Sequence, residues 1–271
     1  MTIVSADLTP GERLARALTE TPEAAEVTVE LPVSLPTTFP FFAERPRYTV
    51  RHLLEALPVP ESGTVFVHEP PAVDAPELSG TQYASSPEAS FVPRLERGGL
   101  TELRARVPLP EGLTAHPELL ARYVDRRVTV RLCTIENQVL LHGSDDGVIT
   151  GLLRVPGRRG ARGPLAAAAA LVEETGGSCD GMVVHPDVYW TLVADGLLDR
   201  LTAVGVRVSR TRMIDRGQAL LGDFRAAATL LDPARSRVRL LPGPGGTAVE
   251  CSALVGLAVH LPQHLLLLEL D

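Results

Sequence analysis

The histidines are the first residues to test for chemistry, because histidine is the commonest general base and metal ligand. His185 and Asp187 stand two positions apart, so one interpretation is an imidazole placed beside a carboxylate. The other interpretation is that this segment caps a helix that begins at Pro186. A cap needs no catalysis, and we favour it.

Two further histidine patterns could imitate a metal or acid–base site. His142 opens the sequence HGSDDG, whose two aspartates could join it in a cluster, although small polar residues after Gly143 also suit the turn that ends a helix. His260 and His264 have the spacing of a metal-binding helix face, but the proline between them disfavours a helix. We therefore expect a turn at the first pattern and surface positions for the second pair.

Arginines gather in one glycine-rich segment. They are Arg154, Arg158, Arg159 and Arg162. The segment could bind an anion or RNA, and it could equally be a solvated surface or a surface between subunits. We favour a surface role, which is commoner for loops of this composition.

The composition excludes several classes of function. The chain has 271 residues and a net charge of −7, a sign that repels nucleic acids and anionic membranes. All of its basic residues are arginine, as is typical of a high-GC bacterial genome, so lysine-based chemistry is excluded. Its three cysteines, Cys133, Cys179 and Cys251, are far apart, which fits a reducing compartment and no zinc or redox motif. With no recognisable catalytic motif either, we expect no enzyme activity and no cofactor.

Two helices have clear signals in the sequence. Thr9, Pro10 and Glu12 form the pattern of a capping box at the start of a short helix. Between residues 117 and 142 leucine, isoleucine and valine recur at spacings of three and four, and Gly143 suits the left-handed residue after the last turn. This second pattern predicts one helix of roughly 39 Å at ~1.5 Å per residue.

Between these helices the chain is poor in large apolar residues. After the first helix, prolines favour an extended arm with one helical turn near residues 51–57. Alternation then predicts short strands at residues 64–68, 90–95 and 100–107. The first two strands cannot bury a core of their own, so they must pack either on their own domain or on a neighbouring subunit.

The second half of the chain alternates helices and strands. Residues 164–175 and 186–194 are expected to be helices, and Tyr189 and Trp190 are expected in the core. The expected strands are residues 181–185, 204–209, 219–221, 226–231, 236–241 and 248–253, with two more ending at Leu270. The fold class is α+β, with a mixed sheet and an α/β insertion in mid-chain.

The order of these segments is itself informative. The runs LLEALPVP, YVDRRVTVRLCTIENQVLLHGSDDG and MVVHPDVYWTLV, taken in order, resemble the major capsid proteins of Hong Kong 97-type tailed phages. They also resemble the encapsulins, bacterial nanocompartment shell proteins with the same fold, and the likeness extends from about Arg51 to the end. Some phage shells use a lysine for an isopeptide crosslink, which this chain cannot form. The short capped helix ahead of Arg51 is also similar to encapsulins, so we favour a short-chain encapsulin over a phage or prophage capsid.

The resemblance implies a division of the chain. Residues 1–50 are expected to be the N-terminal helix and arm. Residues 51–61 and 100–151 are expected to form a peripheral domain with its spine helix at 117–142. The expected extended loop is 62–99, the axial domain is 152–225, and 226–271 are returning strands.

The resemblance also implies a function. The chain is expected to assemble with copies of itself into an icosahedral cytoplasmic shell, which encloses cargo proteins and admits small molecules through pores, with no nucleic acid or membrane as partner. The residues expected at the contact between subunits are Phe66, Tyr83, Phe91, Val92 and Arg94. An enzyme that uses His185 and Asp187, or the HGSDDG loop, is the remote alternative.

Overall fold

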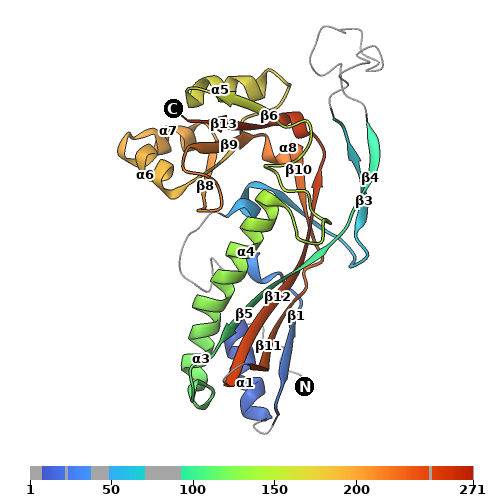
Figure 1. Ribbon diagram of the computed structural model, residues 1–271, viewed down its shortest axis with the longest axis vertical. Helices are drawn as coiled ribbons and strands as arrows, with labels where there is room; N and C mark the ends of the chain where they lie inside the picture. Colours follow the sequence, from blue (N-terminus) through green and yellow to red (C-terminus); the bar gives the residue numbers. More distant parts are fainter. Residues whose placement is uncertain (1–7, 22–23, 38–48, 71–92, 244–245, 271) are drawn as a thin grey trace. The chain divides into compact units, whose positions relative to one another are not determined.

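The computed structural model describes residues 8–21, 24–37, 49–70, 93–243 and 246–270, drawn as ribbon in Figure 1. The chain forms two compact units. Unit 1 comprises residues 1–46, 102–136 and 232–255. Unit 2 comprises residues 47–101, 137–231 and 256–271.

Unit 1 combines helices with an antiparallel sheet. Its elements are α1 (Pro10–Glu20), β1 (Val27–Leu31), β5 (Thr101–Pro108), a 3₁₀ turn (Leu113–Ala115), α3 (Pro117–Tyr123), a π-helical segment (Val124–Val128), β11 (Ser236–Gly243) and parts of α4 (Thr129–His142) and β12 (Gly246–Val259). β11 lies between β1 and β12, and β5 also pairs with β12. Along β11 the buried Val238 and Leu240 alternate with arginines, so one face of the sheet is apolar.

The capping box predicted at the first helix is confirmed. The hydroxyl of Thr9 accepts a hydrogen bond from the amide of Glu12 at 3.2 Å, and the Glu12 carboxylate accepts one from the amide of Thr9 at 2.8 Å. Both bonds satisfy amides that a helix start leaves without partners. Leu14 is fully buried on the inner side of α1.

The long helix predicted over residues 117–142 is confirmed with one difference. α3, the π-helical segment and α4 follow one another without a break, and Gly143 has a φ of +92°, as the pattern predicted. The π-helical turn was not predicted, because one extra residue in a turn leaves the apolar spacing almost unchanged. It brings Asp125 to a buried position beside Val124 and Val128.

Unit 2 contains a five-stranded mixed sheet. Its strands are β6 (Arg159–Arg162), β7 (Gly181–Val184), β8 (Arg207–Arg210), β9 (Gln218–Gly222) and β13 (Leu265–Glu269), in the order β6-β13-β9-β7-β8. Helices α5 (Leu165–Glu173), α6 (Pro186–Ala194) and α7 (Leu197–Ala203) contribute side chains to a core with Met182, Leu221 and Leu266. The α/β pattern expected in mid-chain is confirmed.

The remaining elements of unit 2 are short. They are a 3₁₀ turn (Val50–Leu53), β2 (Glu55–Pro58), β3 (Thr64–His68), β4 (Arg94–Gly98), α8 (Phe224–Ala227), β10 (Ala228–Asp232) and a second 3₁₀ turn (Pro262–His264). β3 and β4 form a separate two-stranded sheet, and β10 pairs with the last residues of β12.

Several expectations about single elements were wrong. Trp190 is 59% exposed on α6, because Leu192 together with Val188 and Tyr189 forms the side of this helix that packs against the core. His264 is buried, since the 3₁₀ turn at Pro262 directs it inward to the carbonyl of Thr175 at 3.1 Å. The tail holds one 14-residue strand, β12, where two shorter strands were expected.

Candidate functional site

The two-stranded sheet of β3 and β4, called the ribbon below, has one apolar face open to solvent. In its register Val67 lies directly opposite Leu95, and Val65, two residues from Val67 on the same face, lies opposite the exposed Arg97, so the face is apolar apart from this arginine. These side chains are 68% (Val65), 43% (Val67) and 79% (Leu95) exposed. We call them the outer ribbon face.

The opposite, inner face of the ribbon packs on the rest of unit 2. Phe66 is partly buried against Val59, Leu231 and Ala258, and its ring meets that of His260 edge-on at 5.5 Å between centroids. Gly98 lies close to Leu231, and an added Cβ would come within 2.5 Å of its Cδ1, so a larger residue would require the Leu231 side chain to shift.

Hydrogen bonds fix the base of the ribbon to the end of β12. The amide of Glu69 donates to the carbonyl of His260 at 2.7 Å, and the imidazoles of His68 and His260 lie 2.8 Å and 2.9 Å from the carbonyls of Val259 and Val67. The position of the ribbon is therefore set by its inner face, while its outer face is held out as an apolar surface. An isolated two-stranded ribbon gains little stability from such a face, so the face suits contact with another protein.

The structure describes two of the five predicted contact residues. Phe66 lies on the inner face of the ribbon, and Arg94 is exposed on that same face, opposite His68. Tyr83, Phe91 and Val92 lie outside the described residues. A role of these five residues in subunit contacts stays a prediction.

Sequence reasoning missed the outer ribbon face. The sequence TVFVH alternates a phenylalanine with two valines, so both faces of β3 are apolar, and phenylalanine is the larger side chain. The larger side chain packs inward, and the valines remain exposed. Val65 and Val67, which flank Phe66, were the feature of the sequence from which this face could have been predicted.

The pair His185 and Asp187 forms the start of α6, as predicted. The Nδ1 atom of His185 accepts a hydrogen bond from the amide of Asp187 at 3.2 Å, which is a cap in the ordinary sense. The carboxylate of Asp187 lies 3.3 Å from the Arg216 guanidinium. The imidazole lone pair needed by a general base is thus engaged by the backbone.

The HGSDDG loop forms the predicted turn. Asp146 accepts hydrogen bonds from the hydroxyls of Ser144 at 2.5 Å and Thr101 at 2.7 Å and from the amide of Val148 at 3.0 Å. These bonds, that from Ser144 foremost, lower the pKa of Asp146. The Nε2 atom of His142 lies 2.6 Å from the Met213 carbonyl, away from a shared cluster.

Two of the three cysteines have thiols that burial keeps protonated, and the described part of the chain shows no metal site. Burial raises the pKa of the Cys179 thiol to about 11 and also raises the pKa of Cys251, so both remain protonated at neutral pH. Among the described residues, His, Cys, Asp and Glu nowhere gather in threes with the geometry of a metal site. No described helix is both long enough and apolar enough to cross a bilayer.

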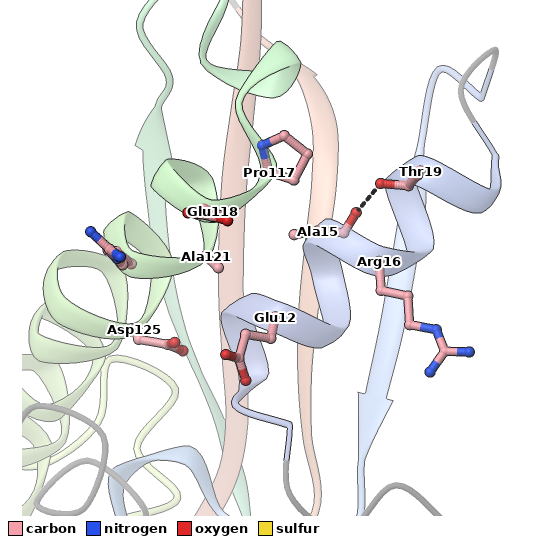
Figure 2. A pocket seen from close by; sticks show the side chains of 9 residues that line it. Glu12, Ala15, Arg16, Thr19, Pro117, Glu118, Ala121 and Asp125 are labelled. Carbon is pink, nitrogen blue, oxygen red and sulfur yellow. Dashed lines mark hydrogen bonds between the residues drawn. The ribbon is translucent and has the colours of Figure 1, made fainter. Parts of the chain in front are cut away.

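A groove in unit 1 separates α1 from α3 (Figure 2). Glu12, Glu118 and Asp125 line it together with Arg16 and Arg122. Asp125 accepts hydrogen bonds from the Thr9 hydroxyl at 2.6 Å and the Gly11 amide at 2.8 Å, so it anchors the start of α1. Burial is the main cause that raises the pKa of this carboxyl. Glu12 and Asp125 are thus engaged in hydrogen bonds at the start of α1. The groove is the boundary along which α1 and α3 pack.

Comparison with known proteins assigns the fold. A scan of protein-family models returned no match, and neither did a search of curated proteins. Solved structures do match. A virus-like particle from Pyrococcus furiosus is 14% identical, with a TM-score of 0.57 over 87% of this chain and 97% of that one.

Phage and related capsid structures match equally well. The structure from Mycobacterium phage Adephagia is 15% identical, with a TM-score of 0.59 over 84% of this chain and 91% of that one. The capsid of a native gene transfer agent particle is 19% identical, with a TM-score of 0.57 over the same shares. The chain therefore has the Hong Kong 97-type capsid fold, and the sequence resemblance is confirmed at the level of the fold.

Proposed function

We propose that this protein is the subunit of a closed icosahedral shell and that the outer ribbon face is covered by a neighbouring copy. The observation that carries the proposal is an apolar surface of Val65, Val67 and Leu95 held out from a capsid fold by an inner face that is already packed. Contacts between different surfaces of identical subunits close into rings, and symmetry repeats each contact many times.

The proposed roles of the chain segments follow from the capsid fold. Residues 62–99 act as the extended loop that reaches a neighbour, residues 117–142 act as the spine of the peripheral domain, and residues 152–225 act as the axial domain, whose loops surround pores. Phe66 supports this contact indirectly, because its packing on Leu231 and His260 holds the ribbon in place.

Within this class we propose an encapsulin that encloses cargo proteins. The support is the absence of lysine, which removes the crosslinking amine of some phage shells, and the net charge of −7, which disfavours close contact with packaged DNA. A phage or gene-transfer capsid is the second candidate, favoured by the likeness to the Adephagia and gene transfer agent structures.

The direct test is whether the purified chain assembles. We expect size-exclusion chromatography and negative-stain imaging to show uniform closed particles. Leu95→Asp places a charge in the contact and should lower particle yield by about a hundredfold, because a desolvated unpaired charge costs several kcal/mol. Glu96→Gln, on the inner side of the same strand, is the matched control and should assemble like the wild type.

Wild-type protein that stays monomeric at every salt concentration would overturn the shell function. The particle contents decide between the two candidates. Protein cargo in particles with the ultraviolet spectrum of pure protein supports an encapsulin. DNA protected from nuclease supports the phage or gene-transfer capsid instead.

A further inference from the structure

The outer side of α6 carries an apolar surface that its own chain leaves open. Trp190 is 59% exposed and Val193 is 38% exposed, and the two lie on one side of the helix because they are three positions apart. The opposite side of α6 packs on the core of unit 2. In the proposed axial domain, residues 152–225, the one other exposed large apolar side chain is that of Val204.

Neighbouring side chains hold Trp190 in place. Its ring meets that of Tyr189 edge-on at 5.5 Å between centroids, and Tyr189 itself packs on the core. The guanidinium of Arg210, on β8, lies 4.4 Å from the centre of the Tyr189 ring and 5.3 Å from that of the Trp190 ring. Tryptophan, tyrosine and arginine are the residues that contribute most to contacts between proteins, and side chains that are already ordered lose less entropy on binding.

The same surface carries a positive charge without a carboxylate partner. Arg210 contacts the two rings and makes no ion pair among the described residues. A guanidinium that stacks on a ring through its flat face keeps its N–H groups directed sideways, so it can still donate to a carboxylate. We call Trp190, Val193 and Arg210 the α6 surface.

The next helix carries a surface of complementary chemistry. α7 packs beside α6 (Figure 1), and Val204 at its end is 76% exposed, next to the exposed Ala203. Asp199 lies one turn before Ala203 on the same side of α7, and its exposed carboxylate makes no ion pair within the part of the chain that the structure describes. Arg200 beside it is also exposed. We call Asp199, Arg200, Ala203 and Val204 the α7 surface.

We propose that the α6 surface of one copy of this chain binds the α7 surface of a second copy. In this contact the carboxylate of Asp199 pairs with Arg210. Arg200 covers the open side of the Trp190 ring, because aromatic faces attract cations. The exposed valines of the two surfaces are buried against each other.

A second copy is the occupant that the charges favour. The α6 surface has a cation that lacks a carboxylate, and the α7 surface has a carboxylate that lacks a cation. Because both surfaces belong to one chain, the contact can repeat from copy to copy and close into a ring. The inference rests on the proposed shell, since the ribbon contact alone gives a ring or a filament and a closed shell needs a second, independent contact.

The fluorescence of the wild type tests this contact without any change at the two surfaces. Trp190 is the single tryptophan of the chain, so the emission reports on this position alone. We expect acrylamide to quench the emission less in wild-type particles than in the monomer fraction of Leu95→Asp, whose ribbon contact is broken. The emission should also shift to shorter wavelength in the particles, because the ring leaves water.

An exchange of charges tests the pairing of Asp199 with Arg210. Arg210→Glu and Asp199→Arg each bring like charges together across the contact, and each should lower particle yield at least about tenfold. The double variant restores an opposite pair and should assemble better than either single variant. Asp215→Arg makes the same change of charge at an exposed turn, so it is the matched control and should assemble like the wild type.

Circular dichroism and melting temperature of the subunits show whether each variant folds. Asp199 is exposed on its helix, so Asp199→Arg should keep the wild-type values. If Arg210→Glu fails to fold, Asp199→Arg and the fluorescence decide the matter.

Four results would overturn the inference. Equal quenching of Trp190 in particles and monomers is one, and normal assembly of both single charge variants is another. A double variant that assembles no better than the single ones would contradict the pairing. Protection of Trp190 that appears only when a second kind of protein fills the particle would assign the α6 surface to cargo. In each of these cases the wild type still assembles, whereas a wild type that never assembles overturns the proposed shell as well.

Discussion

Two antiparallel strand pairs of this protein each have facing apolar side chains but opposite surroundings. In β11 and β12 the facing pairs Val238 with Cys251 and Leu240 with Val249 are buried in unit 1. In β3 and β4 the facing pair Val67 with Leu95 is exposed. Both pairs therefore present β-branched and aliphatic side chains on one face, and only the first pair is covered by its own chain within the described residues.

The difference separates residues that stabilise the folded subunit from residues that we expect to stabilise the assembly. Apolar residues of β11 and β12 contribute to the free energy of folding of the isolated subunit, at about 25 cal/mol per Å² buried. Those of the outer ribbon face contribute less, because 43% to 79% of each side chain stays exposed until a partner covers it. The same kind of substitution should therefore have different consequences in the two places.

The largest effect is expected from a charge in the covered pair. Val238→Asp places an unpaired carboxylate at a position that is fully buried between β1 and β12. It should destabilise the subunit by about 4 kcal/mol or more, so little soluble protein should be recovered. Circular dichroism and yield measure this. A stable, soluble Val238→Asp subunit would contradict the expected difference between the two strand pairs.

The same substitution in the exposed pair should spare folding and stop assembly. Val67→Asp adds a charge at an exposed position, so the free energy of unfolding should change by at most about 1 kcal/mol. Particles should nevertheless be absent by negative stain, while the subunit melts as before. Full-sized particles from this variant would show that the outer ribbon face faces solvent in the assembly.

A smaller effect is expected at the base of the ribbon. Phe66→Ala removes the ring that packs on Leu231 and His260, which should cost about 2 kcal/mol because the site is only partly buried. Hydrogen exchange should then speed up across β3 and β4 but not across β11 and β12. Equal acceleration in both pairs would mean that the two pairs do not unfold separately.

The smallest effect is expected when the pH is lowered. Glu102 lies on β5, which pairs with β12. Burial raises the pKa of its carboxyl, but hydrogen bonds from Arg104 and Ser252 outweigh burial, so the pKa is lowered overall. A lowered folded pKa means that the carboxylate stabilises the fold at higher pH and that this stability is lost as the pH falls below about 4.5. Exchange in β11 and β12 should therefore rise in acid before it changes in the ribbon. Glu102→Gln should flatten this pH dependence, and an unchanged profile would contradict it.

Local signals in the sequence predicted much of this fold. The capping box at Thr9 and the left-handed Gly143 were found because each depends on a few neighbouring residues. β6 was missed, since the sequence RGAR has neither alternation nor β-branched residues and is a strand only because β13 pairs with it. The helix α7 was missed because its N-cap, Gly196, carries no side-chain signal.

The candidate site was predicted by region but not by residue. The shortage of apolar residues between Ser62 and Gly99 pointed to a segment without a core. Which face of β3 is free depends on Leu231 and Ala258, which lie far along the sequence and pack on Phe66. Sequence periodicity cannot tell two apolar faces apart, and only tertiary packing makes that choice.

The size of the purified chain in solution tests the central claim most directly. Sedimentation velocity at several protein concentrations should show one fast species of roughly 1.7 MDa or larger, the mass of about 60 copies in the smallest icosahedral shell. A single slow species of 29.0 kDa, unchanged across concentration and salt, would contradict the account.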